Sequence, residues 1–226
     1  MDVRVSLFNE LTIANDCFFC LSNVNVAKHL VVSIGSEIYL ALAKGPLTTP
    51  EATGLNVPGH VLIIPIAHTP VPSASETEEM ESHQLKLTNF FEARGCHAVT
   101  FEMHHSDAIH SHWQVVAIPK AKLLEEEFIK GFAEKKMMLE KRDPGASEEY
   151  CRVVLPTGVY VATLPVRFDL QLPRRILAKI LGLEERNDWR GCVQTEDEER
   201  ADAAAFRQAF ESEDRDVTQP DPETSV

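Results

Sequence analysis

The stretch His-Ser-His-Trp-Gln-Val, residues 110–115, carries the pattern from which the fold is inferred. On an extended strand, side chains two positions apart lie on the same face, so His110 and His112 share a face with Gln114. Ser111 and Trp113 lie on the opposite face. The same alternation also occurs in a half-exposed strand with one solvent-facing side. The stripe alone therefore does not distinguish a site from a surface.

A pair of cysteines upstream favours a site. Cys17 and Cys20 are separated by two residues, the spacing with which a tight turn brings two sulfurs onto one zinc ion at about 2.3 Å. A tetrahedral site needs two more ligands, and the sequence contains no second Cys-x-x-Cys pair, so histidines must supply them. Nine histidines are present, and His68 directly follows a predicted strand.

The order of predicted elements is strands, helix, strands, followed by a second set of short elements. Alternating apolar runs and turn residues predict strands at residues 29–34, 38–43, 60–65, 96–102, 112–118, 152–155 and 159–164. Helical periodicity predicts helices from Ser75 to about Gly95, over 122–140, near 174–181, and from Thr195 to about Phe210. The spacings Ser75-x-x-Glu78 and Thr195-x-x-Glu198 are capping boxes. This is an α+β chain: an antiparallel sheet with packed helices, followed by a small α+β module.

Apolar residues at helical spacing identify the candidate core. In the first helix these are Met80, Leu87, Phe90 and Phe91, and in the second they are Leu124, Phe128, Phe132 and Met138 or Leu139. Trp189 is expected to anchor the core of the C-terminal module, against the alternative of an exposed residue that stacks on RNA. Cys151 and Cys192 are expected to be buried thiols.

Composition excludes several classes of protein. The 226 residues are 44% hydrophobic and 25% charged, with a net charge of −13 that argues against nonspecific coating of nucleic acid. The acidic residues are concentrated after Glu196, so the rest of the chain is nearer neutrality and can carry a local basic surface. Such a surface at Arg174-Arg175 or Lys135-Lys136 is either a nucleic-acid contact or a solvated face. The odd count of five cysteines, of which only two lie close together, argues against a disulfide framework. No apolar run reaches the roughly 18 residues of a membrane span, and no signal peptide is visible, so a soluble intracellular chain is expected.

Two stretches resemble the histidine-triad fold: residues 59–68, Gly-His-Val-Leu-Ile-Ile-Pro-Ile-Ala-His, and residues 110–115. More closely, residues 16–119 resemble the first conserved C-terminal domain of CwfJ-like proteins, through Cys-Phe-Phe-Cys (17–20), Lys-His-Leu-Val-Val-Ser-Ile-Gly (28–35) and Tyr-Leu-Ala-Leu-Ala-Lys-Gly-Pro-Leu (39–47). Phe-Asp-Leu-Gln-Leu (168–172) and Trp-Arg-Gly-Cys (189–192) resemble the second. The resemblance implies four segments: an N-terminal extension (1–14), a histidine-triad-like domain (15–122), a second CwfJ domain (123–212) and an acidic disordered tail (213–226).

The resemblance also implies a site. In the zinc-containing branch the ligands correspond to Cys17, Cys20, His68 and His110, which hold a structural zinc ion. His112 corresponds to the nucleophile of catalytic members, and Gln114 matches the uridylyltransferase-like branch, where its amide donates to a phosphate oxygen. The loop before the motif departs from the catalytic pattern, because Glu102 and Asp107 repel phosphate unless they are paired.

The other histidines are expected to lie outside the site. His104 and His105 are expected on a loop surface, with ligand contact as the alternative. His29, His60, His83 and His97 are expected to be structural or solvent-facing.

CwfJ-like proteins, as the resemblance implies, are nuclear factors of pre-mRNA splicing, and residues 41–47 with 189–192 are closest to the branch associated with intron-lariat debranching. The expected function is that of an accessory factor that binds RNA, the lariat-debranching enzyme or spliceosome proteins, without contacting membrane. Two alternatives stay open: a nucleotidyl hydrolase or transferase with a nucleotide ligand at His112, and a vestigial scaffold domain. Because an N-terminal metallophosphoesterase-like domain usually precedes these two, the chain is expected to be a fragment or shortened form.

Overall fold

The computed structural model describes residues 17–145 and 147–216. The predicted N-terminal extension, 1–14, and residues 217–226 of the predicted tail lie outside the described residues. The last helix, α6 (Glu196–Asp216), continues past Phe210 into the segment expected to be disordered. No helix in the two described ranges is long and apolar enough to cross a membrane.

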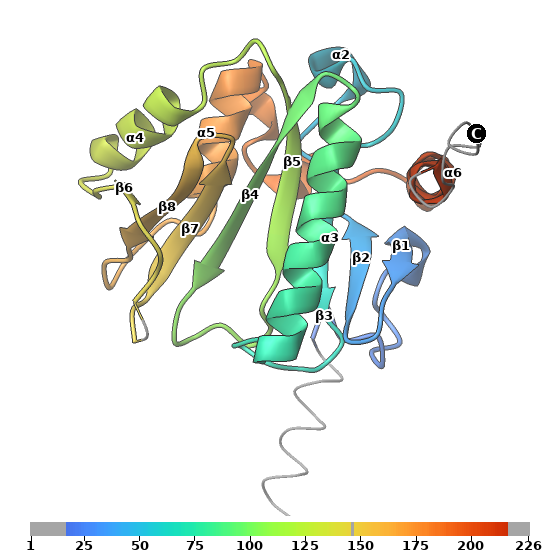
Figure 1. Ribbon diagram of the computed structural model, residues 1–226, viewed down its shortest axis with the longest axis horizontal. Coiled ribbons are helices and arrows are strands. Elements are labelled where there is room, and N and C mark those ends of the chain that lie inside the picture. The colour runs from blue at the N-terminus through green and yellow to red at the C-terminus, as the bar shows by residue number, and fades with distance from the viewer. Residues whose placement is uncertain (1–16, 146, 217–226) are drawn as a thin grey trace, which may run out of the picture.

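Eight strands of the described residues form one antiparallel sheet, which confirms the α+β class (Figure 1). The strand order is β1-β2-β3-β5-β4-β7-β8-β6, so strands from the second half of the chain extend the sheet begun by the first half. Their bounds are β1 Val31–Ile34, β2 Ile38–Leu42, β3 His60–Pro65, β4 Cys96–His104, β5 Trp113–Pro119, β6 Glu140–Lys141, β7 Tyr150–Leu155 and β8 Gly158–Thr163. Each strand predicted from alternation is present.

Helices cover both faces of the sheet. On one face, α3 (Ala74–Glu92) packs Met80, Leu87, Phe90 and Phe91 into a core that includes alternate residues of β2, β3 and β5 (Figure 1). On the other face, α4 (Glu125–Glu134) and α5 (Leu172–Leu181) cover β4, β5, β7 and β8, with Phe128 and Phe132 fully buried. The helix α6 packs at the β1 edge, where Phe206 contacts Phe90. The remaining elements are the short helices α2 (Pro50–Thr53), η1 (Lys28–Leu30), η2 (Glu184–Arg186) and η3 (Trp189–Cys192).

Two more predicted helix boundaries differ from the structure. The capping box of α3 is formed by Ser73 and Glu76 rather than by Ser75 and Glu78. Both Ser-x-x-Glu pairs have the spacing of a capping box. The upstream pair begins directly after Pro72, so a cap there lets the helix begin earlier and become longer. The helix predicted over 122–140 ends at Glu134, because Lys136 adopts a positive φ of 59°. Residues 137–139 then connect α4 to β6, with Leu139 buried and Met138 exposed.

Trp189 does not anchor the C-terminal core, contrary to expectation. It is only partly buried, and the Arg190 guanidinium lies over its ring. Its segment is held through the backbone instead: a Cβ at Gly45 would lie 2.1 Å from the carbonyl oxygen of Trp189, so only glycine permits this approach. Cys151 and Cys192 are buried thiols, as expected.

Candidate metal centre and the adjoining polar strip

Four side chains from three segments form one cluster: Cys17, Cys20, His68 and His110, whose ligand atoms all lie within 4.8 Å of one another. The cysteines belong to a turn before β1, His68 follows β3, and His110 precedes β5. Because β3 and β5 are antiparallel neighbours, the end of one strand meets the beginning of the other. All four residues that the resemblance assigned to metal are therefore brought together.

The spacing around His110 fits a tetrahedral zinc ion, whereas His68 lies closer to Cys20 than a tetrahedral ion would hold it. The Nδ1 atom of His110 lies 3.4 Å from Cys17 Sγ and 3.6 Å from Cys20 Sγ, and His68 Nδ1 lies 3.1 Å from Cys20 Sγ. Zinc–sulfur and zinc–nitrogen bonds of about 2.3 and 2.05 Å at a tetrahedral angle give a sulfur–nitrogen separation of about 3.6 Å. The cluster can therefore hold a metal ion, and its soft donor set favours zinc.

Neighbouring groups orient the donors. His110 Nε2 donates to the carbonyl oxygen of Pro65 at 2.9 Å, which leaves the Nδ1 lone pair facing the sulfurs. Asn23 donates to the Cys17 carbonyl at 2.9 Å and closes the turn. Burial, together with the adjacent Cys17, raises the pKa of Cys20 to about 11. Thiol protons must therefore be lost when a metal binds.

His112 lies beside the cluster and is not one of its members. Its ring lies 4.5 Å from the ring of Phe19, which belongs to the cysteine turn, and its Nδ1 is 3.5 Å from the carbonyl of His110. Burial lowers the pKa of His112 to about 4, so the imidazole is neutral at pH 7. A neutral imidazole can act as a hydrogen-bond partner or as a nucleophile.

Gln114 contacts His60, a residue that was expected to lie outside the site. Gln114 Oε1 lies 3.1 Å from His60 Nε2, and the backbone N–H of Leu47 donates to His60 Nδ1 at 3.1 Å. We call His60, His112 and Gln114 the polar strip. In the sequence, the only indication of a role for His60 was its position at the start of an otherwise apolar strand. Its contact with Gln114 depends on the register of β3 and β5, in which His60 pairs with Val116.

Glu102 does not occupy the polar strip. In the register of the sheet it is opposite Arg152, whereas Phe101 is opposite Gln114, so Glu102 and Gln114 lie on opposite faces. Its carboxylate is 3.8 Å from Arg152 and accepts from the Tyr150 hydroxyl at 3.4 Å. Burial raises its pKa. Asp107 is exposed on the loop.

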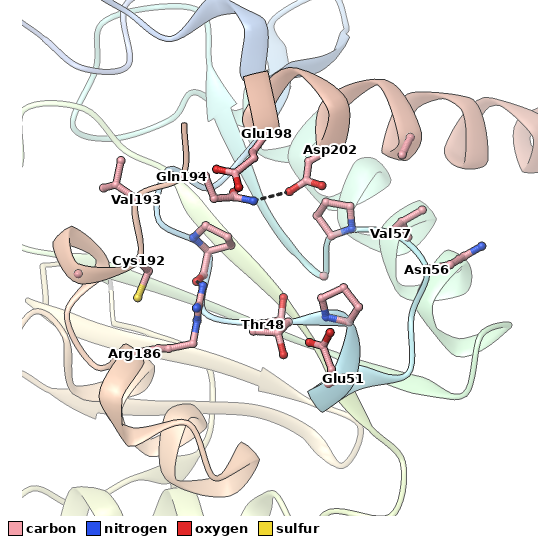
Figure 2. Close-up of a pocket in the computed structure, with 17 residues that line it drawn as sticks. Thr48, Glu51, Asn56, Val57, Arg186, Cys192, Val193, Gln194, Glu198 and Asp202 are labelled. Atoms are coloured by element: carbon pink, nitrogen blue, oxygen red, sulfur yellow. Dashed lines mark hydrogen bonds between the residues drawn. The ribbon is translucent and has the colours of Figure 1, made fainter. Parts of the chain in front are cut away.

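The remaining histidines have structural contacts. His104 stacks on Tyr150, and His105 packs edge-on against Phe168. The other three contact acidic residues or their backbone: His29 with Glu199, His97 with Glu92, and His83 with the carbonyl of Glu79. A separate pocket lies between the loop at residues 46–59 and the segment 186–205 (Figure 2). None of the described residues that line it belongs to the predicted site.

Comparisons with known proteins agree with the resemblance in the sequence. Residues 9–130 match the family model described as protein similar to CwfJ C-terminal, and residues 110–215 match protein similar to CwfJ C-terminus 2. The chain is 46% identical over 216 residues to CWF19-like protein mug161 of Schizosaccharomyces pombe, covering 88% of this chain and 38% of the relative. It is 35% identical over 218 residues to CWF19-like protein 1 of Homo sapiens, with the same two coverages. The chain thus spans about two fifths of the length of these relatives.

One solved structure, of a uridylyltransferase, aligns with a TM-score of 0.31 and 17% identity, covering 54% of this chain and 41% of that one.

Proposed function

Since this chain belongs to the CwfJ-like family, we propose that it is an accessory factor of pre-mRNA splicing and intron-lariat turnover, and that it binds RNA at the polar strip beside a zinc centre. Its partners are RNA together with the lariat-debranching enzyme or spliceosome proteins, and its location is the nucleus. The division into a histidine-triad-like domain (15–122) and a second CwfJ domain (123–212) belongs to the same proposal.

The contact between Phe19 and His112 carries this proposal. Phe19 lies between the two cysteines, and its ring is 4.5 Å from that of His112, so a zinc ion in the cluster would fix both sides of the contact. In this role zinc is structural: it ties the cysteine turn to the ends of β3 and β5. Removing it would release Phe19 from the polar strip.

The chemistry of the polar strip and of the adjoining cysteine turn suits single-stranded RNA. His112 and Gln114 supply hydrogen-bonding groups for phosphate or base edges, and Phe19 supplies a ring for stacking. Phe18, on the same turn, is 84% exposed and offers a second aromatic face. Because the net charge is −13, affinity has to come from these local contacts rather than from a broad basic surface.

Titration of linear and branched RNA with zinc-loaded protein tests the proposal. We expect Phe19→Ala to weaken binding by about 1–3 kcal/mol, the usual contribution of one stacked base, with a matched Phe168→Ala control that retains it. Absent binding to both RNA forms, or binding that Phe19→Ala leaves unchanged, would contradict the proposal. Co-purification from cell extract with identification of bound RNA and proteins then tests the proposed partners.

A second candidate function is nucleotidyl hydrolysis or transfer by His112. The 3.5 Å approach of its Nδ1 to the His110 carbonyl favours this function, because a proton held there leaves Nε2 as the free nucleophile. Nε2 would bond to an α-phosphorus as the bond to the leaving phosphate breaks, and water would resolve the nucleotidyl-histidine. Trapping with labelled dinucleotides tests this reaction. If no adduct forms, or if the adduct persists in His112→Asn, the reaction at His112 is refuted and the chain is a binding module. If RNA binding is absent as well, the chain is a scaffold domain.

A further inference from the structure

Two arginines from the second half of the chain hold the loop at residues 45–47 through its carbonyl oxygens. Arg174 donates to the carbonyl of Gly45 at 3.1 Å, and Arg186 donates to those of Pro46 at 2.7 Å and Leu47 at 2.9 Å. Figure 2 shows the Arg186 side chain extending towards the loop that carries Thr48. Within the described ranges, neither guanidinium forms an ion pair with a carboxylate, although Arg174 is only 4% exposed. Backbone carbonyl dipoles, together with the Cys192 sulfur that lies 3.6 Å from Arg174, therefore take the place of a counter-ion.

One of these carbonyls belongs to the peptide group that contacts the polar strip. The C=O of Pro46 and the N–H of Leu47 are two ends of the same peptide unit. Its oxygen accepts from Arg186, and its N–H donates to His60 Nδ1 at 3.1 Å. A charged donor on the carbonyl polarises the peptide and strengthens its N–H as a donor.

The direction of this hydrogen bond sets the tautomer of His60. A backbone N–H can only donate, so Nδ1 must accept, and the ring proton must be on Nε2. Nε2 then donates to Gln114 Oε1 at 3.1 Å. Gln114 is thereby held with its oxygen towards His60, and its amide NH₂ has no hydrogen-bond partner among the residues that the structure describes.

The surroundings keep His60 neutral, as this arrangement requires. An imidazolium would present N–H groups on both sides and would oppose the Leu47 N–H. Burial, followed by the nearby positive charge of Arg174, lowers the pKa of His60 to about 3. Arg174 also donates to the backbone carbonyl of Arg186 at 2.9 Å, so it supports the second arginine directly.

We propose that Arg186, supported by Arg174, is a positioning residue that acts through the Leu47 peptide and His60 to hold the Gln114 amide as a donor for an acceptor oxygen, such as that of a phosphate. The second half of the chain thus orients the Gln114 amide through the loop at residues 45–47. The identity of the ligand rests on the proposed function, whereas the relay from Arg186 to Gln114 can be measured without any ligand.

Nuclear magnetic resonance of the full chain with ¹⁵N-labelled histidine and glutamine measures the relay. In the wild type, His60 must show the Nε2–H tautomer at pH 7. In Arg186→Met we expect mixed tautomers of His60 and shifted side-chain amide resonances of Gln114, with partial recovery in Arg186→Lys. Arg190→Met is the matched control, because Arg190 lies on the same segment, is exposed and pairs with Asp188.

Two results would overturn the proposal: a wild-type His60 that carries its proton on Nδ1, or a folded Arg186→Met protein with His60 and Gln114 resonances at wild-type positions. If Arg186→Met does not fold, the proposal is tested by the His60 tautomer of the wild type and by the His60 and Gln114 resonances of Arg186→Lys. A second readout is affinity for a short single-stranded RNA, expected to fall roughly five-fold in Arg186→Met, the factor for one hydrogen bond of about 1 kcal/mol. If the wild type does not bind RNA, the proposed function fails. The resonances of His60 and Gln114 still test the relay from Arg186.

Discussion

Removal of the proposed zinc ion is expected to lower the free energy of unfolding by an amount that can be calculated. The four ligands lie at residues 17, 20, 68 and 110, so they come together only when the sheet has formed, and binding stabilises the folded chain selectively. Free zinc at 100 times its dissociation constant contributes about 2.7 kcal/mol. A domain of this size changes its midpoint by about 2–4 °C per kcal/mol, so chelation should lower Tm by about 5–11 °C.

The assay is thermal unfolding in a zinc buffer and in a chelator, for three proteins. The wild type should show the full difference in Tm, and Cys20→Ser should lose most of it. Cys192→Ser should retain it, because Cys192 is a buried thiol outside the cluster. A wild type that melts at one temperature in both solutions, or an equal loss in Cys192→Ser, would refute the reasoning.

Three further predictions concern His60, Gln114 and Phe206. His60 has a folded-state pKa of about 3 against an ordinary value of 6.5, so the unfolded chain binds the proton first and stability falls as pH drops below 6.5. Between pH 7 and pH 5 this group should account for about 2 kcal/mol, measured as the difference in pH dependence of urea unfolding between wild type and His60→Gln; equal pH profiles would contradict it. Gln114→Glu places a negative charge on the polar strip and should weaken RNA binding on the order of ten-fold, whereas unchanged affinity in filter binding would place the RNA elsewhere. Phe206→Ala should cost about 3–5 kcal/mol in denaturant unfolding, because this fully buried ring packs α6 on the core of the first half; a loss below 1 kcal/mol would mean that α6 is not part of that core.

Local patterns in the sequence predicted the strands and the cores of the long helices. Alternation and periodicity depend only on neighbouring residues, and Met80, Leu87, Phe90 and Phe91 are buried as their spacing requires. Helix ends were less predictable. Overlapping Ser-x-x-Glu frames compete at the start of α3, and the positive φ at Lys136 that ends α4 has no glycine to signal it.

The four residues of the candidate metal cluster were expected from the resemblance, and strand order then explains why they meet. His60 could not be linked to Gln114 in this way, because the two residues are 54 positions apart and their hydrogen bond depends on the register between β3 and β5. The contacts of Arg186 with residues 46 and 47 are longer in range still and follow no motif. The proposed division near residue 122 stays a prediction, and the sheet is continuous across it.

Mapping of RNA crosslinks on the zinc-loaded protein tests the central claim most directly. After ultraviolet irradiation with a short single-stranded RNA, mass spectrometry should locate the adducts on the peptides that carry Phe18, Phe19 and His112, and chelation should remove them. Adducts confined to other surfaces, such as α6 or the segment after α5, or adducts on these peptides that persist without zinc, would contradict an RNA site formed by the polar strip and the metal centre together.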